Sequence, residues 1–238
     1  MTVVAFIAFS LFQYVGDPVL AMVGQDATPA ERQQLRTDLG LDQPFHAQFA
    51  RFAANALRGE FGLSYRQSRK VSTLLRERLP ATLELSFAAA VLALAVGIPM
   101  GVYTALRRRG LLSGLFLTVS LLGVSLPTFL IGILLIMLFA VQLGWLPSYG
   151  RGETVAIGWW TSGFLTLDGL RHLVLPAITL CLFQTTLIMR LVRAEMLEVL
   201  RTDYIKFARA RGLSNRTIHF GHALKNTLVP VIKITGLQ

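Results

Sequence analysis

Three long apolar segments constrain the fold of this chain more than any other feature. They cover residues 83–106, about 115–143, and 173–192. Each is long enough to cross the roughly 30 Å hydrocarbon core of a bilayer as a helix. Water is absent from that core, so backbone N–H and C=O groups must bond to one another, and a helix satisfies them. The sequence therefore predicts an all-α, polytopic membrane helical bundle.

The composition favours a membrane protein over a soluble domain. Hydrophobic residues make up 53% of the 238 residues, charged residues make up 15%, and the mean hydropathy is +0.56. Soluble domains carry about 25% charged residues. A net charge of +10 would also suit a nucleic-acid binder, but the apolar segments argue against nucleic acid as a partner. The single cysteine, Cys181, excludes a disulfide within the chain.

The loops between the apolar segments differ in their basic charge. Arg107, Arg108 and Arg109 follow the first segment, and the loop at 193–227 carries seven Lys or Arg. The loop at 144–171 carries only two. The positive-inside rule places the more basic loops in the cytoplasm. This pattern predicts a multi-pass membrane protein with its basic loops in the cytoplasm and accounts for much of the basic excess.

The apolar segments and loops divide the chain into five parts. Residues 1–15 are apolar but too short to cross a bilayer, and are expected to be part of a first transmembrane helix. Residues 16–80 are expected to form an external helical cap, and residues 81–192 three transmembrane helices with short loops. Residues 193–227 form a cytoplasmic loop. Residues 228–238 begin a further span, so a fragment of a longer protein is expected.

The predicted cap contains the helix signals of soluble proteins. Thr28-Pro29-Ala30-Glu31 is a capping box with proline at the first helical position. Phenylalanines lie on one face of a second helix, which ends at Gly59, and an amphipathic stretch at 71–79 leads to the membrane. A cap on the outer membrane surface is expected, with a docking surface for an external partner as the alternative.

The sequence contains no motif for catalysis or metal binding. It lacks a glycine-rich loop ending in Gly-Lys-Ser/Thr, so the chain is not expected to hydrolyse ATP. It also lacks a His-Glu-x-x-His motif and a cysteine cluster. His219 and His222 share a helix face without a third ligand nearby, and are expected to meet solvent or a partner. No metal site, cofactor or enzymatic activity is predicted.

The loop at 193–227 carries the strongest local pattern. Residues 203–214 read Asp-Tyr-Ile-Lys-Phe-Ala-Arg-Ala-Arg-Gly-Leu-Ser. Asp203 is expected to cap a helix that runs to Arg211. Gly212 allows a left-handed turn, and Ser214 is expected to cap a second helix that leads into the next span. The sequence therefore predicts a helix, a tight turn and a helix across the membrane surface.

Force on such a unit would move both adjoining spans together. The small residues Ala208 and Ala210 would let another protein approach closely, and Arg209 and Arg211 would meet its carboxylates. An amphipathic segment that rests on anionic lipid headgroups is the alternative that these residues leave open.

The segment 203–214, followed by His222-Ala-Leu-Lys-Asn-Thr-Leu-Val-Pro230, resembles the cytoplasmic loop of permease subunits of binding-protein-dependent ABC importers. It is most similar to the first permease of the dipeptide, oligopeptide and nickel branch. Lys206-Phe207-Ala208 occupies the Glu-Ala-Ala position of the wider family, and Ala208 and Gly212 match it. The resemblance extends over nearly the whole chain through Gly16-Asp17-Pro18, Leu39-Gly-Leu-Asp-Gln-Pro44, Gly59-Glu-Phe-Gly-Leu-Ser64, Leu79-Pro-Ala-Thr-Leu-Glu-Leu85 and Gly97-Ile-Pro-Met-Gly101.

This resemblance implies the type I permease fold of ABC importers and a set of partners. A second, related permease would complete the pore, two ATPase subunits would hold ATP and Mg, and an extracytoplasmic binding protein would deliver a di- or oligopeptide or a related solute. The spans would lie in the lipid of a bacterial inner membrane. The residues that would couple to the ATPase are Asp203, Tyr204, Ala208, Arg209, Ala210, Arg211, Gly212 and Leu213.

Depth in the membrane suggests residues of the translocation pathway. Gln184 and Thr185 lie near the middle of the third apolar segment, where polar groups face the protein interior or water. Hydrogen bonding between helices is the alternative. Pro127 lies inside the second segment and is expected to kink it. Glu84 lies near the outer end of its span and is interpreted as a contact with another subunit.

Other classes of membrane protein remain as alternatives. An ion-coupled secondary transporter usually carries ionisable residues deep in several spans, whereas only Glu84 and Arg190 come close here. A membrane receptor or scaffold would bind a signalling protein through the same loop. An intramembrane enzyme is disfavoured, because the sequence shows no set of catalytic residues. The sequence therefore predicts the transmembrane permease subunit of an ATP-driven importer.

Overall fold

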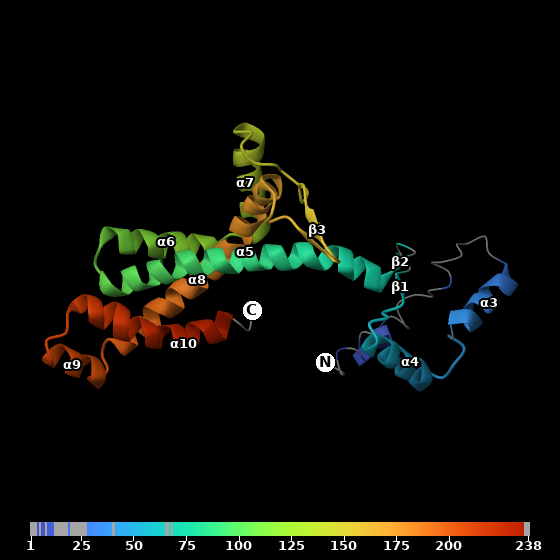
Figure 1. Cartoon of the computed structure of the whole chain (residues 1–238), viewed down its shortest axis with the longest axis horizontal. Coiled ribbons are helices and arrows are strands. Elements are labelled where there is room, and N and C mark those ends of the chain that lie inside the picture. Colours follow the sequence, from blue (N-terminus) through green and yellow to red (C-terminus); the bar gives the residue numbers. More distant parts are fainter. Residues whose placement is uncertain are drawn as a thin grey trace. The chain divides into compact units, whose positions relative to one another are not determined.

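The computed structural model describes residues 4, 6–7, 9–11, 19, 28–39, 41–64, 67 and 69–235 of the chain. These residues fall into two units, 1–79 and 80–238 (Figure 1). Within the predicted segment 1–15, the described residues are helical. The Gly16-Asp17-Pro18 motif and the last three residues of the predicted segment 228–238 lie outside the described ranges.

The described residues of the first unit include two complete helices and a short hairpin. They are α3 (Pro29–Leu39), α4 (Phe45–Leu57), β1 (Leu63–Ser64) and β2 (Arg69–Lys70). The helix predicted from the capping box begins at Pro29, and the predicted second helix is confirmed as α4. The Phe6 ring centroid lies 5.7 Å from that of Phe45 and 5.2 Å from that of Phe49, both edge-to-face. These aromatic contacts pack against the half-buried face of α4.

A single helix of 36 residues, α5 (Val71–Leu106), covers the first apolar segment. The amphipathic stretch predicted at 71–79 and the span that follows it form one continuous helix. A proline removes only one backbone donor, and α5 continues through both Pro80 and Pro99. At about 1.5 Å per residue, α5 is about 54 Å long and exceeds the roughly 30 Å of a hydrocarbon core.

The second apolar segment is broken, although the sequence predicted one kinked helix. It forms α6 (Leu111–Ser125), α7 (Thr128–Leu135) and the π-helical stretch η1 (Ile136–Gln142). The two parts meet at an angle of 106°. Pro127 stands at the break with an extended ψ of 134°, because it lacks an N–H and disfavours helical backbone in the preceding residue.

Among the described residues, length and composition allow two helices to cross a membrane: α5 and α8 (Leu167–Val199). The bent pair of α6 with α7 and η1 adds a third if it forms one span. α8 extends beyond both ends of its predicted span at 173–192, so the predicted loop at 193–227 begins as helix.

The close crossing of α5 and α8 lies at the centre of the second unit (Figure 1). A Cβ atom built on Gly97 would lie 2.9 Å from Ile188 Cγ2, and one built on Gly101 would lie 2.6 Å from Val192 Cβ. Only glycine allows this approach. The two glycines belong to a stripe of buried small residues with a four-residue repeat: Ala89, Ala93, Gly97, Gly101 and Ala105. The stripe forms the face of α5 that meets α8.

A hairpin of β3 (Val155–Ile157) and β4 (Trp160–Ser162) precedes α8, and the sequence analysis missed it. Gly158, the first residue of its two-residue turn, has a φ of +63°. Such turns favour glycine at a position with positive φ. The all-α prediction therefore holds for the spans, while the connecting segments contain two short hairpins.

Glu84 of α5 anchors this hairpin and is only 6% exposed. Its Oε2 lies 3.0 Å from Arg151 Nη2, and its carboxylate accepts the Gly163 N–H at 3.1 Å. Trp160 Nε1 donates to Oε1 at 3.4 Å, and Arg151 also donates to Thr161 Oγ1 at 2.7 Å. The interpretation of Glu84 as a contact with another subunit is wrong, because its partners belong to its own chain.

We expect Gly101→Ala to lower the melting temperature of the purified protein in detergent. The added Cβ would meet Val192 Cβ and, at 2.8 Å, the Met189 carbonyl oxygen, and overpacking of this kind costs about 1–3 kcal/mol. Gly114→Ala on α6 is the control, because nothing lies within 4 Å of its Cβ position. It should be neutral or stabilising by up to about 1 kcal/mol. Equal melting temperatures for the two variants would rule out the close crossing.

We also expect Glu84→Ala to destabilise the protein, since it leaves Arg151 without its carboxylate. Breaking a fully buried ion pair costs about 3–5 kcal/mol. A smaller loss is expected here, because the Arg151 side chain is 30% exposed. The double variant Glu84→Ala with Arg151→Leu should melt at a higher temperature than Glu84→Ala alone, because no unpaired charge remains.

Glu77→Ala supplies the control for this pair. Glu77 forms an ion pair with Arg69 in which both side chains are about half exposed, and exposed pairs contribute little. If Glu84→Ala lowered the melting temperature no more than Glu77→Ala does, the contact between Glu84 and Arg151 would not stabilise the protein.

Candidate functional site

The predicted helix of the cytoplasmic loop is present as α9 (Asp203–Ala210), between α8 and the π-helical stretch η2 (Thr217–Ala223). The N-cap residue is Thr202, whose side chain makes no cap hydrogen bond. Asp203 is the first helical residue, where a carboxylate meets the positive end of the helix dipole. Lys206 Nζ donates to its Oδ1 at 2.8 Å. The helix is confirmed, and the predicted capping role of Asp203 is wrong.

The turn after α9 has the predicted conformation. Gly212 has a φ of +77°, in the left-handed region that other residues resist. The Leu213 N–H donates to the Ala208 carbonyl at 3.3 Å and closes the end of the helix. Ser214 caps the next helical stretch, because its Oγ accepts the Thr217 N–H at 3.3 Å.

The inner face of α9 is buried within its own chain. Ile205 is 0% exposed and Ala208 is 7% exposed, and both belong to the core that contains Val192 and Met196 of α8. The prediction that Ala208 lets a second protein approach is therefore wrong. Its small side chain instead lies in the packing of α9 against the rest of the second unit, where interior packing is dense. A displacement of α9 would therefore also displace α8, because the two helices share one packed core.

An apolar patch is exposed on the outer face of α9 and at the turn that follows it. We call it the α9 patch and define it as Tyr204, Phe207 and Leu213. Their side chains are 42%, 64% and 39% exposed. The Arg211 guanidinium lies 5.8 Å from the centroid of the Phe207 ring, and Ala210 is exposed beside it. Large exposed apolar groups rimmed by charge are typical of interaction surfaces. This α9 patch is the part of the loop best suited to meet another protein.

Tyr204 also links α9 to the following helix, α10 (Leu224–Thr235). Asn226 Nδ2 donates to the Tyr204 hydroxyl at 2.7 Å. Deeper in the contact, the buried Thr227 hydroxyl lies 3.6 Å from Met196 Sδ of α8. The loop at 193–227 is thus joined to α8 and α10, the helices on its two sides.

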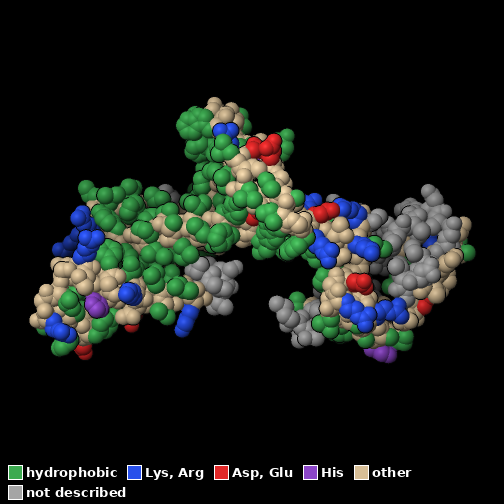
Figure 2. Space-filling view, in the orientation of Figure 1, with side chains coloured by type: hydrophobic (Ala, Val, Ile, Leu, Met, Phe, Trp, Pro, Cys, Tyr) green, Lys and Arg blue, Asp and Glu red, His purple; other side chains and the backbone are tan. Residues whose placement is uncertain are grey.

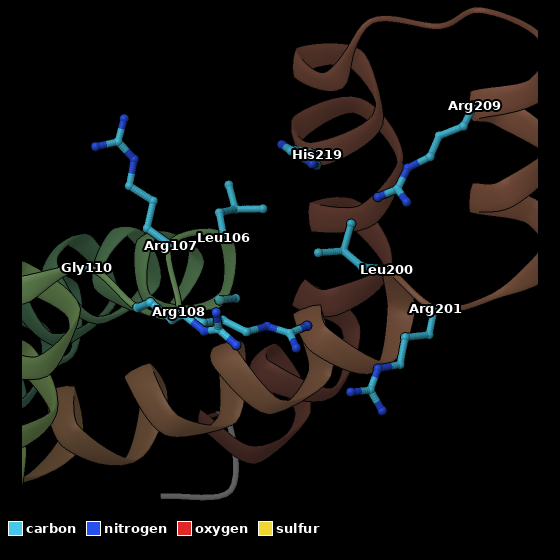
Figure 3. Close-up of a pocket in the computed structure, with 10 residues that line it drawn as sticks. Leu106, Arg107, Arg108, Gly110, Leu200, Arg201, Arg209 and His219 are labelled. Atoms are coloured by element: carbon cyan, nitrogen blue, oxygen red, sulfur yellow. The ribbon is translucent and has the colours of Figure 1, made fainter.

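The two arginines of α9 lie in different surroundings. Arg211 belongs to the rim of the α9 patch, whereas Arg209 lines a cavity together with His219 (Figure 3). Burial and, to a smaller extent, the Arg209 charge lower the pKa of His219 below its usual value. This environment favours the neutral form of the His219 imidazole. Arg209 and Arg211, which were predicted to meet the same partner, therefore belong to two different surfaces.

The predicted pathway residues also differ in their surroundings. Thr185 is buried at 9% exposure, and its carbonyl oxygen would lie 3.1 Å from a Cβ on Gly97, so it belongs to the crossing of α5 and α8. Gln184 Oε1 is buried and has no hydrogen-bond partner within the described ranges. Pro127 stands at the break before α7. Of the three, Gln184 alone has a buried polar side-chain atom without a hydrogen-bond partner among the described residues.

Ionisable groups in the spans do not suggest an ion pathway. Glu84 is paired with Arg151, and the Arg190 side chain is exposed on α8. In the part of the chain that the structure describes, no group of three or more His, Cys, Asp or Glu side chains is placed to hold a metal ion.

The sequence matches the family model "Binding-protein-dependent transport system inner membrane component" over residues 97–238. The model for the N-terminal part of such membrane components matches residues 1–86. A di/tripeptide transport system permease protein, DppB, of Pseudomonas aeruginosa is 40% identical, over 99% of this chain and 74% of its own length.

Two further relatives agree with this match. A putative peptide transport system permease protein of Brucella abortus is 38% identical, over 99% of this chain and 73% of its own length. The oligopeptide transport system permease protein AppB of Bacillus subtilis is 37% identical, over 94% of this chain and 69% of its own length. Together with the apolar spans, these matches show that the chain belongs to the inner-membrane permease components of binding-protein-dependent transport systems.

Proposed function

We propose that this chain is the transmembrane permease subunit of an ATP-driven importer of di- or oligopeptides. The observation that carries the proposal is the position of α9, with one face buried against α8 and the opposite face exposing the α9 patch. The names of the relatives support peptides as the substrate class.

The packing of α9 suggests how force reaches the spans. Ile205 and Ala208 share one core with Val192 of α8, and densely packed interiors transmit displacement rather than absorb it. α8 in turn meets α5 at Gly97 and Gly101. A push on α9 would therefore turn α8 and α5 together, which is the rigid-element motion that alternating access needs.

The α9 patch supports docking of a separate ATPase subunit. Phe207 supplies an exposed aromatic anchor of the kind that carries much of the binding energy in protein interfaces. Arg211 next to it can bind a carboxylate with two parallel hydrogen bonds. ATP and Mg would be held by two such ATPase subunits, because the sequence of this chain contains no phosphate-binding loop.

The charge distribution supports a direction for the transport. The turn at Arg107, Arg108 and Arg109 and the loop that holds α9 would face the cytoplasm. The hairpin of β3 and β4 would then face outward, where a substrate-binding protein delivers the peptide. A second, related permease would complete the pathway, and Gln184 is our candidate for a polar contact along it.

Gly212→Val tests whether the turn is needed for coupling. A β-branched residue resists the observed φ of +77°, so we expect ATP-dependent uptake of a labelled dipeptide into vesicles to fall at least about tenfold, the effect of about 1.4 kcal/mol. Subunit assembly should be retained, because nothing lies within 4 Å of the added Cβ position.

Gly212→Asn is the matched control, since asparagine tolerates left-handed backbone better than other residues. It should retain most of the uptake. Normal uptake by the valine variant would show that the turn geometry has no part in transport.

Phe207→Ala tests the docking surface. Truncating an aromatic anchor costs about 2 kcal/mol or more, which corresponds to about 30-fold weaker ATPase binding. We measure the ATPase that co-purifies with the permease in mild detergent. Phe129→Ala on α7 removes an aromatic side chain of similar exposure, 69% against 64%, and should leave ATPase retention unchanged. Equal retention in both variants would contradict docking at the α9 patch.

A further inference from the structure

A basic cavity lies beside the coupling loop and is not explained by docking at the α9 patch. Its volume is about 750 Å³, and it opens between the turn joining α5 to α6 and the end of α8, with α9 and η2 on its border (Figure 3). Five arginines line it: Arg107, Arg108, Arg109, Arg201 and Arg209.

The positive charge of this cavity is not neutralised by the chain. No carboxylate lines the cavity, and within the described ranges none of the five arginines forms an ion pair with the chain. By contrast, Arg69 and Arg151 each form an ion pair with a glutamate. Five arginines that line one cavity without a counter-ion form a site for an anion with several acceptor oxygens.

The cavity also has an apolar side that a free inorganic anion would not use. Ala105, Leu106 and Leu200 contribute to its lining. Immediately after the arginines, α6 begins with Leu111 and Leu112, which are 96% and 50% exposed. Figure 2 shows this apolar surface continuing along α5 and α6, with Lys and Arg at its end. Cationic groups at the end of an apolar surface lie where lipid headgroups begin.

We propose that the arginine cavity binds the phosphate of an anionic phospholipid of the inner leaflet, with the acyl chains lying along the exposed leucines of α6. The combination of unpaired guanidinium groups and an adjoining apolar surface selects a lipid over a soluble phosphate or an acidic protein segment. The inference depends on the membrane placement of the proposed function, but not on peptide as the substrate or on docking at the α9 patch.

A bound lipid would contact both sides of the coupling region. Arg107, Arg108 and Arg109 belong to the turn after α5, whereas Arg201 and Arg209 belong to the segment that carries α9. A headgroup held by both sets would fix their separation, as bidentate and bridging phosphate contacts do elsewhere. The lipid would then act as a structural part of the coupling region.

The test is retention of phosphatidylglycerol by the assembled transporter, purified from vesicles of phosphatidylcholine with phosphatidylglycerol and measured by native mass spectrometry. The variant is Arg108→Gln with Arg201→Gln. A basic residue near the membrane surface contributes about fivefold to the affinity for anionic lipid, so the double variant should bind phosphatidylglycerol about 25-fold more weakly. Phosphatidylcholine binding should not change.

The control is Arg171→Gln with Arg216→Gln, which removes the same charge at two exposed positions that do not line the cavity. It should retain phosphatidylglycerol as the wild type does. Equal loss or equal retention in the two double variants would overturn the proposal.

Two further results would also overturn it. Inorganic phosphate that displaces the lipid and shows the same dependence on Arg108 and Arg201 would assign the cavity to a free anion. Loss of the ATPase from the Arg108→Gln, Arg201→Gln complex, with lipid retention unchanged, would assign it to a protein interface. Phe207→Ala tests docking separately, so a failure here is distinguishable from a failure of the proposed function.

Discussion

The close crossing of α5 and α8 is the contact on which the rest of the second unit depends. Inside a bilayer, burial from water contributes nothing to helix association, so close packing must hold helices together. Gly97 and Gly101 allow that packing, because any larger side chain would overlap Ile188 or Val192. The stripe of small residues extends this contact from Ala89 to Ala105. α8 is positioned by α5, and α9 is positioned by α8.

A single core runs from this crossing into the coupling loop. Its buried members include Ala93 of α5, Val192 of α8, Ile205 of α9 and Val231 of α10. Because these side chains share one packed cluster, α9 cannot move independently of the spans. The buried face of α9 packs against the helices of the core, and its opposite face remains exposed and available for contact with a partner protein. The separation of these two faces is the main property that the fold gives to the site.

The features that the sequence predicted correctly are local ones. The start of α3, the left-handed turn at Gly212 and the cap at Ser214 depend on the chemistry of a few neighbouring residues. The pairing of Glu84 with Arg151 joins residues 67 positions apart, and no local pattern indicates it. Burial of Ala208 likewise depends on where α8 lies. The four-residue repeat of small residues on α5 is present in the sequence. The sequence does not show that α8 is the helix that packs against it.

The contact between Glu84 and the β3–β4 hairpin affects the fluorescence of the protein. The chain contains three tryptophans, and two of them, Trp159 and Trp160, lie edge-to-face with ring centroids 5.5 Å apart. The Trp160 indole also donates to the Glu84 carboxylate. Opening of that contact would change the polarity and hydrogen bonding around an indole, and hence its emission. Intrinsic fluorescence is therefore a built-in reporter of whether α5 and the hairpin stay joined, without any attached dye.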